Sequence, residues 1–136
     1  MRLLDVADML ADVLSEIIEK SSIYAGNINA NENSCIGVYA SKRSAPHKFA
    51  IGGSESTLTR EKDVTVLIHH TDNPSLAEKF ANDVLDILAD VRQYDLPAYM
   101  ICYLSCSEPI DVGRDDRGIC EYVIEMKIYY QYRKDE

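Results

Sequence analysis

Histidine, cysteine and clustered acidic residues are the side chains of this sequence that could carry out chemistry. Its three histidines are His47, His69 and His70. His69 and His70 are adjacent, so in a strand their rings point to opposite faces and do not share one metal ion. A hydrolytic site could pair one of them with Asp115 or Asp116, but no G-x-S-x-G nucleophile motif accompanies them. We therefore predict a protein that is not an enzyme, with a hydrolase as an alternative.

The four cysteines do not have the spacing of a metal site. Cys35, Cys102, Cys106 and Cys120 contain no C-x-x-C pair. Cys102 and Cys106 would lie roughly 13 Å apart along a strand, which is too far for two ligands of one zinc ion. Free, packed thiols in a reducing cytoplasm are the prediction, and disulfides are the alternative.

Residues 111–118 form an acidic run whose spacing resembles a calcium-binding loop. An EF-hand that began there would need Gly at its sixth position and Glu at its twelfth, where the chain has Asp116 and Tyr122. Arg114 and Arg117 also offset the negative charge. We predict a hairpin connection built on Asp and Gly turn geometry, with no metal and no cofactor, while cation binding stays an open question.

The hydrophobic pattern indicates one α+β domain over residues 1–136 with a small mixed or antiparallel sheet of about four strands. Two helices pack on one face of that sheet. Asn73 and Pro74 have the residue types of an N-cap and a first helical position. The predicted order of elements is helix, strand, strand, helix, strand, strand. We expect a helix at 3–20 and strands at 35–40 and 63–70, with an extended loop at 41–56 between the two strands. A helix at 74–91 and a C-terminal hairpin at 98–132 follow.

The charge distribution favours contact between copies of the chain. The net charge is −9, which argues against binding the phosphate backbone of nucleic acids without sequence preference. A basic segment nevertheless contains Lys42, Arg43, His47 and Lys48, whereas the first 34 residues hold two basic and six acidic residues. Opposite charges on different surfaces suit head-to-tail association, although a solvated loop explains the lysines equally well.

The sequence predicts neither a signal peptide nor a membrane-spanning helix. The N-terminal segment has an acidic amphipathic pattern in place of a signal peptide, and no stretch approaches about 18 consecutive apolar residues.

Several segments, in order, resemble the phage minor capsid and tail-terminator proteins of long-tailed phages and prophages. They cover roughly residues 35–132, beyond the generic amphipathic first helix. These segments are Ile36-Gly37-Val38-Tyr39, Ser41-Lys42-Arg43, Ile51-Gly52-Gly53, Val66-Leu67-Ile68-His69, the helix after Asn73-Pro74, the run from Glu108 to Gly113 with Asp116 and Gly118, and the closing Tyr129-Tyr130.

The resemblance implies a non-enzymatic virion protein with no cofactor. It would form a ring of its own copies, typically a hexamer, that caps the tail tube and joins it to the head during assembly in the bacterial host cytoplasm. Its partners would be the tail tube protein and the head–tail connector proteins. A small-ligand or peptide-binding module that uses the 41–56 loop is the alternative. The residues expected to contact neighbouring subunits or the tail tube are Lys42, Arg43, His47, Lys48, Asp111, Arg114, Asp115 and Arg117.

Overall fold

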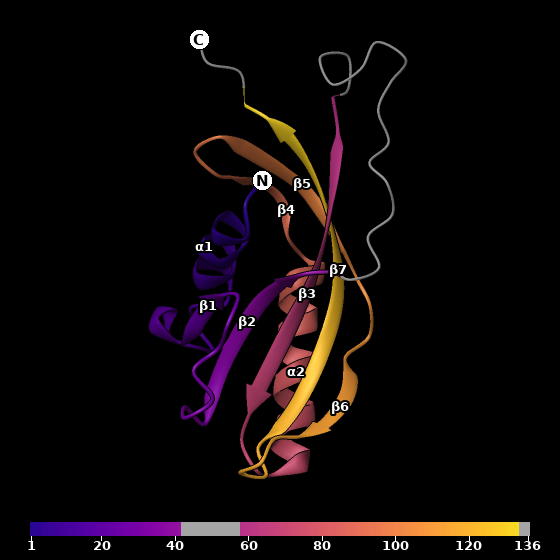
Figure 1. Ribbon diagram of the computed structural model, residues 1–136. Helices are drawn as coiled ribbons and strands as arrows, with labels where there is room; N and C mark the ends of the chain where they lie inside the picture. The colour runs from indigo at the N-terminus through magenta and orange to yellow at the C-terminus, as the bar shows by residue number, and fades with distance from the viewer. Residues whose placement is uncertain (42–57, 134–136) are drawn as a thin grey trace.

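The computed structural model describes residues 1–41 and 58–133. Within these ranges seven strands form one curled sheet that packs against two α-helices (Figure 1). The elements are α1 (Leu3–Val13), the 3-10 helix η1 (Lys20–Ser22), β1 (Ile23–Ala25), β2 (Ser34–Ala40), β3 (Arg60–His70), α2 (Pro74–Ala89), β4 (Arg92–Asp95), β5 (Tyr99–Cys106), β6 (Ile110–Arg114) and β7 (Cys120–Tyr132).

The sheet is mixed and is organised around β7. Its strand order is β1-β2-β3-β7-β5-β4, and β6 also pairs with β7. β1 runs parallel to β2, and every other pair is antiparallel. β3 pairs with one edge of β7 along most of its length. The other edge of β7 is shared by two strands: β6 pairs with the start of β7, and β5 pairs with its end.

Period-two alternation gives the sheet two different faces. On β3, Val64, Val66 and Ile68 are fully buried against the helices. Their partners across the β3–β7 ladder include Ile124 and Met126, which confirms the predicted alternation of β7. The intervening residues form the opposite side, called the outer face below. They are Asp63, Thr65 and Leu67 on β3 and Val123, Glu125 and Lys127 on β7.

Both helices contribute side chains to one hydrophobic core on the other side of the sheet. The core residues of the helices recur at helical spacing, so each helix turns one apolar stripe inward. They include Val6, Met9, Leu10 and Leu14 from the first helical segment and Phe80, Ala81, Val84 and Leu88 from α2. Full burial of one such large side chain contributes about 1.5–3 kcal/mol.

The start of α2 is as the sequence predicts. The Asn73 side chain accepts hydrogen bonds from the backbone N–H groups of Ser75 and Leu76, at 3.0 and 3.2 Å, and Pro74 is the first helical residue. The helix ends at Ala89, two residues before the predicted end.

The first helix is shorter than the predicted 3–20 segment. It ends at Val13, beyond which Ser15 bonds back to Asp12 and Ile17 to Leu14, both three residues away. Turns of this kind keep Ile18 in the core, so the apolar period persists without an α-helix.

The expected number of about four strands was wrong, because the described residues contain seven. None of the three additional strands has a fully buried residue. β1 has only three residues, β4 reads Arg-Gln-Tyr-Asp, and all five residues of β6 are exposed. β6 also divides the predicted 98–132 hairpin, so its two long strands are joined through a third.

The structure also bears on the membrane and thiol predictions. No described helix has the length and apolar character needed to cross a bilayer. All four cysteines fall within the described ranges and are free thiols.

Candidate assembly interface

The predicted contact residues divide into two groups. Lys42, Arg43, His47 and Lys48 lie outside the described residues, as does most of the 41–56 loop, so their role stays a prediction. Asp111, Arg114, Asp115 and Arg117 lie together on β6 and on the β6–β7 turn, residues 115–119, at one end of the sheet.

The β6–β7 turn is organised by the carboxylate of Asp115. Its Oδ1 accepts hydrogen bonds from the backbone N–H groups of Arg117 and Ile119, both at 2.9 Å, and Gly118 adopts a φ of +82°. Desolvation acts to raise the pKa of Asp115, but these N–H groups, with the nearby His69 and Arg117, outweigh it and hold that pKa below its usual value. The turn is thus stabilised by the ionised form of Asp115.

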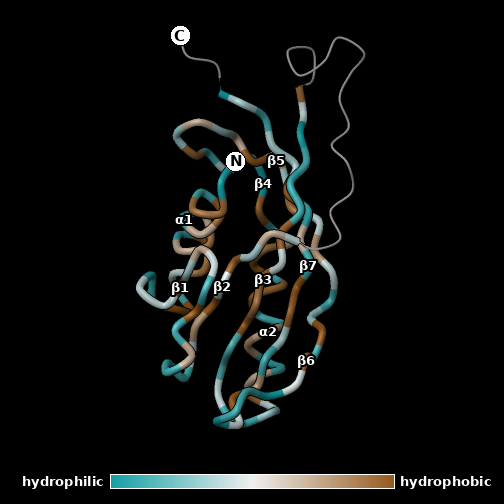
Figure 2. Tube along the Cα trace, in the orientation of Figure 1, coloured by the Kyte–Doolittle hydropathy of each residue, from teal (hydrophilic) through white to brown (hydrophobic). Residues whose placement is uncertain are grey.

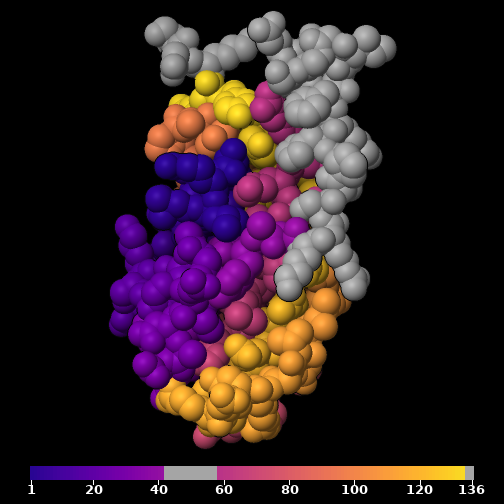
Figure 3. Space-filling view, viewed as in Figure 1, coloured from indigo at the N-terminus to yellow at the C-terminus, as the bar shows by residue number. Residues whose placement is uncertain are grey.

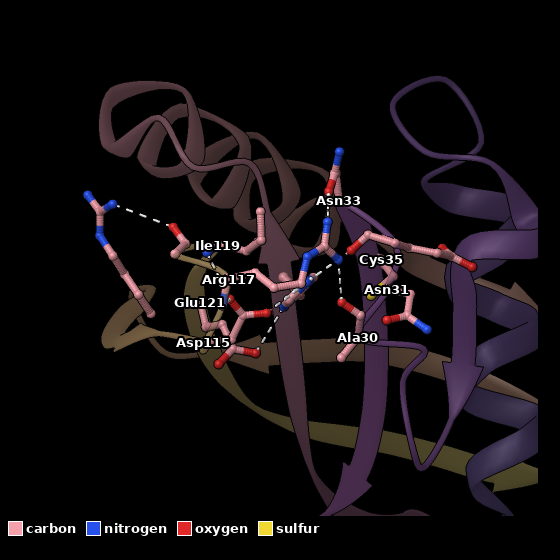
Figure 4. A network of polar contacts seen from close by, with 12 residues as sticks. Ala30, Asn31, Asn33, Cys35, Asp115, Arg117, Ile119 and Glu121 are labelled. Atoms are coloured by element: carbon pink, nitrogen blue, oxygen red, sulfur yellow. Dashed lines mark hydrogen bonds and ion pairs between the residues drawn. The ribbon is translucent and has the colours of Figure 1, made fainter.

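The side chain of Arg117 links this turn to the loop between β1 and β2 by hydrogen bonds (Figure 4). Its guanidinium donates from Nη1 to the carbonyl oxygen of Ala30, at 2.8 Å, and from Nη2 to Oδ1 of Asn33, at 2.7 Å. Arg114 makes weaker contacts, since its Nη1 lies 3.5 Å from the carbonyl oxygens of both Asp72 and Gly118. Of the two arginines, Arg117 therefore fixes the turn.

His69 lies beneath the same turn and is fully buried. Its Nδ1 is 3.2 Å from Oε2 of Glu121, and its Nε2 is 3.0 Å from the carbonyl oxygen of Glu32 and 3.6 Å from Oδ2 of Asp115. Because the ring is enclosed, it offers no nitrogen to a substrate. It ties β3 to β7 and to both loops.

His70 points to the opposite side of the sheet, as its position next to His69 predicts. Its ring stacks on Phe80 of α2 at 4.0 Å, and its Nδ1 lies 2.8 Å from Oγ of Ser34. Burial lowers the pKa of His70, so the ring sits neutral in the packing between α2 and the sheet. Within the described part of the chain, no group of three His, Cys, Asp or Glu side chains is arranged to hold a metal ion.

A groove of about 1080 Å³ runs along the outer face beside these residues. Strands β2, β3 and β7 contribute its floor, and β5 and β6 its rim. Its apolar lining includes Tyr39, Leu67, Ile110, Val112 and Val123. Its polar lining includes Ser41, Asp63, Thr65, Ser105, Glu125 and Lys127.

The polar groups of the groove are largely bonded to one another. Oε2 of Glu125 accepts a hydrogen bond from Oγ1 of Thr65 at 2.9 Å. Nζ of Lys127 lies 3.6 Å from Oε2 of Glu61 and 3.9 Å from Oδ1 of Asp63. Since two carboxylates face the one ammonium, the groove keeps an excess of negative charge.

Comparison with known proteins decides the family. Residues 6–132 match the family described as bacteriophage tail terminator protein. The chain belongs to that family. Among solved structures it is similar to a chain of the virion of the native gene transfer agent (GTA) particle. That match has a TM-score of 0.50 and 11% identity, and covers 97% of this chain and 90% of that chain. No curated protein matches the sequence.

For this tail terminator the family resemblance noted in the sequence is confirmed, and it indicates a structural role in a phage tail. The sequence did not predict the groove. Its walls come from five strands, so the lining residues are scattered from Tyr39 to Lys127. One signal was present, because Ile110 and Val112 are apolar residues in an otherwise polar connection. Figure 2 shows hydrophobic colour on β6.

Proposed function

We propose that this protein is a non-enzymatic tail terminator that forms a ring of identical copies, closes the finished tail tube and joins it to the head. The observation that carries the proposal is the family match, which spans residues 6–132. The ring is expected to be a hexamer that assembles in the host cytoplasm and stays in the virion. Its neighbours are the tail tube protein on one side and the head–tail connector proteins on the other.

The described surface supports this role. A closed ring needs two different patches on each copy, because each subunit meets its neighbours head to tail. β6 offers one patch of exposed apolar side chains, since Ile110 and Val112 are 48% and 52% exposed. Asp115 and His69 use their polar atoms in contacts that hold the β6–β7 turn in place. A turn held in this way suits a rigid contact surface.

The negative charge of the chain is compatible with a ring through which DNA passes. A chain with a net charge of −9 does not attract the phosphate backbone strongly as a whole. The partners of the ring are therefore proteins.

The test is whether the purified protein stops tail tubes from growing. Light-scattering mass after size exclusion, at several protein and salt concentrations, is expected to show a ring-sized species or a monomer that associates reversibly. Added to polymerising tail tube protein, it is expected to shorten the tubes, with density at their ends in electron micrographs. Tubes of unchanged length with bare ends, and a strict monomer throughout, would exclude the proposal.

A further inference from the structure

Both ring nitrogens of His69 face hydrogen-bond acceptors. Nε2 lies 3.0 Å from the carbonyl oxygen of Glu32, and because a carbonyl oxygen can only accept, Nε2 carries a proton. Nδ1 lies 3.2 Å from Oε2 of Glu121, and an ionised carboxylate can likewise only accept. Two states satisfy this geometry: either the ring is protonated on both nitrogens, or Glu121 holds a proton that it donates to Nδ1.

The surroundings of the ring favour the doubly protonated state. The His69 side chain is fully buried, whereas the side chains of Glu121 and Asp115 are 22% and 18% exposed. Because both carboxylates reach water, each is ionised at low cost. A buried cation is stable where it is paired and hydrogen-bonded. Here Oε2 of Glu121 lies beside Nδ1, and Oδ2 of Asp115 lies 3.6 Å from Nε2.

Strand β2 and the β1–β2 loop add a further carboxylate and a neutral thiol. On the loop, the carboxylate of Glu32 accepts a hydrogen bond from the phenol of Tyr24. On β2, Cys35 is the partner of His69 in the β2–β3 ladder. Burial, with the charges of Glu32 and Glu121, raises the pKa of the Cys35 thiol to about 11. Cys35 therefore stays neutral while the ring titrates.

The β6–β7 turn contributes a positive charge as well as the carboxylate of Asp115. Arg117 lies close enough to Asp115 to lower the pKa of that carboxyl, and its guanidinium is hydrogen-bonded to the β1–β2 loop. One guanidinium thus accompanies the three carboxylates of Glu32, Asp115 and Glu121. A protonated ring brings the opposite charges of this region closer to balance.

We propose that His69 is a buried imidazolium that holds the β6–β7 turn in place, and that loss of its proton releases the turn. A neutral ring would leave the lone pair of Nδ1 facing the Glu121 carboxylate and would end the attraction to Asp115. The folded protein thus holds this proton more tightly than the unfolded chain does. The stabilisation is complete in mildly acidic solution, where both carboxylates are ionised, and is lost as the pH rises and the folded protein releases the proton.

Release of the turn would loosen one end of β6. The turn connects β6 to β7, and β6 carries the exposed side chains of Ile110 and Val112. Figure 3 shows β6 and the turn, in orange to yellow, at the surface of the lower end of the molecule. The proton on His69 therefore controls how firmly this apolar patch is held. The inference concerns the folded chain itself and does not depend on formation of a ring.

NMR of the full-length protein, labelled with ¹⁵N at histidine, tests the charge of the ring directly. Long-range ¹H–¹⁵N correlation distinguishes protonated from unprotonated ring nitrogens, and urea-unfolded protein gives the reference titration. His69 is expected to be protonated on both nitrogens near neutral pH, where the histidines of the unfolded chain are largely neutral. His70 is the internal control and should be neutral, because burial lowers its pKa. A His69 ring that loses its proton at the same pH as the unfolded chain, or at a lower pH, would overturn the proposal.

Hydrogen exchange of the same unmodified protein tests whether the proton holds the turn. The amides of Arg117 and Ile119 are the reporters, because both donate to Asp115. As the pH passes the His69 titration, their protection factors, corrected for intrinsic exchange, should fall on the order of tenfold. The amide of Leu104, in the core part of β5, should keep its protection. Unchanged protection at Arg117 and Ile119 after the proton is lost would refute the release of the turn.

Glu121→Gln is the matched variant, because it keeps the shape of the side chain and changes its hydrogen-bonding role. The amide of the variant can donate to Nδ1, so a neutral His69 ring is satisfied there. In this variant the ring is expected to be neutral near neutral pH, and the pH-dependent loss of protection in the turn should disappear. A doubly protonated ring in Glu121→Gln, or the same loss of protection, would show that Glu121 does not hold the proton on His69.

Discussion

Arg117 donates to the carbonyl oxygen of Ala30 across 2.8 Å, although the two residues are 87 positions apart in the sequence. Together with the bond to Asn33, this contact sets the position of the β6–β7 turn relative to the β1–β2 loop. The β6 edge is carried by that turn. Under the proposed function, loss of the Arg117 contacts would therefore displace the exposed apolar patch on β6.

Replacing Arg117 by Ala is expected to lower the free energy of unfolding by about 1 kcal/mol, because two charge-assisted bonds are lost at an exposed site. The melting temperature should fall by about 3–5 °C. Arg114→Ala is the control, since its contacts are 3.5 Å long, and it should change the free energy by less than about 0.5 kcal/mol. Equal effects of the two substitutions would show that Arg117 does not fix the turn.

Asp115→Asn is expected to destabilise the protein in a pH-dependent manner. The amide keeps an oxygen for the N–H groups of Arg117 and Ile119 but removes the charge. The pKa of Asp115 is lower in the folded protein than in the unfolded chain. The ionised carboxylate therefore stabilises the folded protein at any pH above the usual carboxyl pKa, and this stabilisation is lost as the pH falls through the pKa that Asp115 has in the folded protein.

The difference in melting temperature between the unmodified protein and Asp115→Asn should thus be largest near neutral pH and shrink below about pH 4. Asp116→Asn removes the same charge from the same turn and should give a smaller, flatter difference. A difference for Asp115→Asn that grew in acid would contradict the assigned hydrogen bonds.

The sequence predicted the elements whose apolar periodicity is strong. The alternation of β3 and β7 and the Asn73 cap of α2 are found as expected, because burial on one face selects those residue types. β4 and β6 were missed because neither strand has a fully buried side chain, so their places in the sheet depend on backbone pairing with β5 and β7.

The candidate site was predictable only in part, for the same reason. Asp115 and Gly118 have residue types that favour a turn, and the sequence indicated one there. The bonds of Arg117 to the β1–β2 loop and of His69 to Glu121 depend on how distant segments meet, and no local spacing indicates that. The enclosed position of His69 likewise follows from two loops that cover it.

Gly37 is expected to be intolerant of a side chain. A Cβ atom at this position would lie 2.6 Å from Cγ2 of Ile28 and 2.8 Å from Cε2 of Tyr39. Gly37→Ala should therefore cost about 1–3 kcal/mol through displacement of the β1–β2 loop. Adding Ile28→Ala should recover part of this cost in a double-mutant cycle monitored by urea unfolding. Strict additivity of the two changes would refute the proposed clash.

Gly118 provides the comparison for this prediction. Nothing lies within 4 Å of a Cβ atom there, but its φ of +82° strains any L residue. Gly118→Ala is expected to cost about 1 kcal/mol, and Ile28→Ala should leave that cost unchanged.

Cys106 pairs with Met126 across the β5–β7 ladder and packs against the hydrophobic core. Burial raises the pKa of the Cys106 thiol to about 11, so little thiolate is present at pH 8. Its alkylation by iodoacetamide should be on the order of tenfold slower than that of an unperturbed thiol, since the greater nucleophilicity of a high-pKa thiolate offsets part of the lost thiolate. Mass spectrometry of peptides from a time course follows Cys106 and Cys102 separately.

Cys102 is the internal control, since it lies on the same strand but is not among the residues packed against the core. Burial also raises the pKa of the Cys102 thiol, but only Cys106 packs against the core, so Cys102 should react first. Equal rates for the two thiols would contradict the packing of Cys106 against the core.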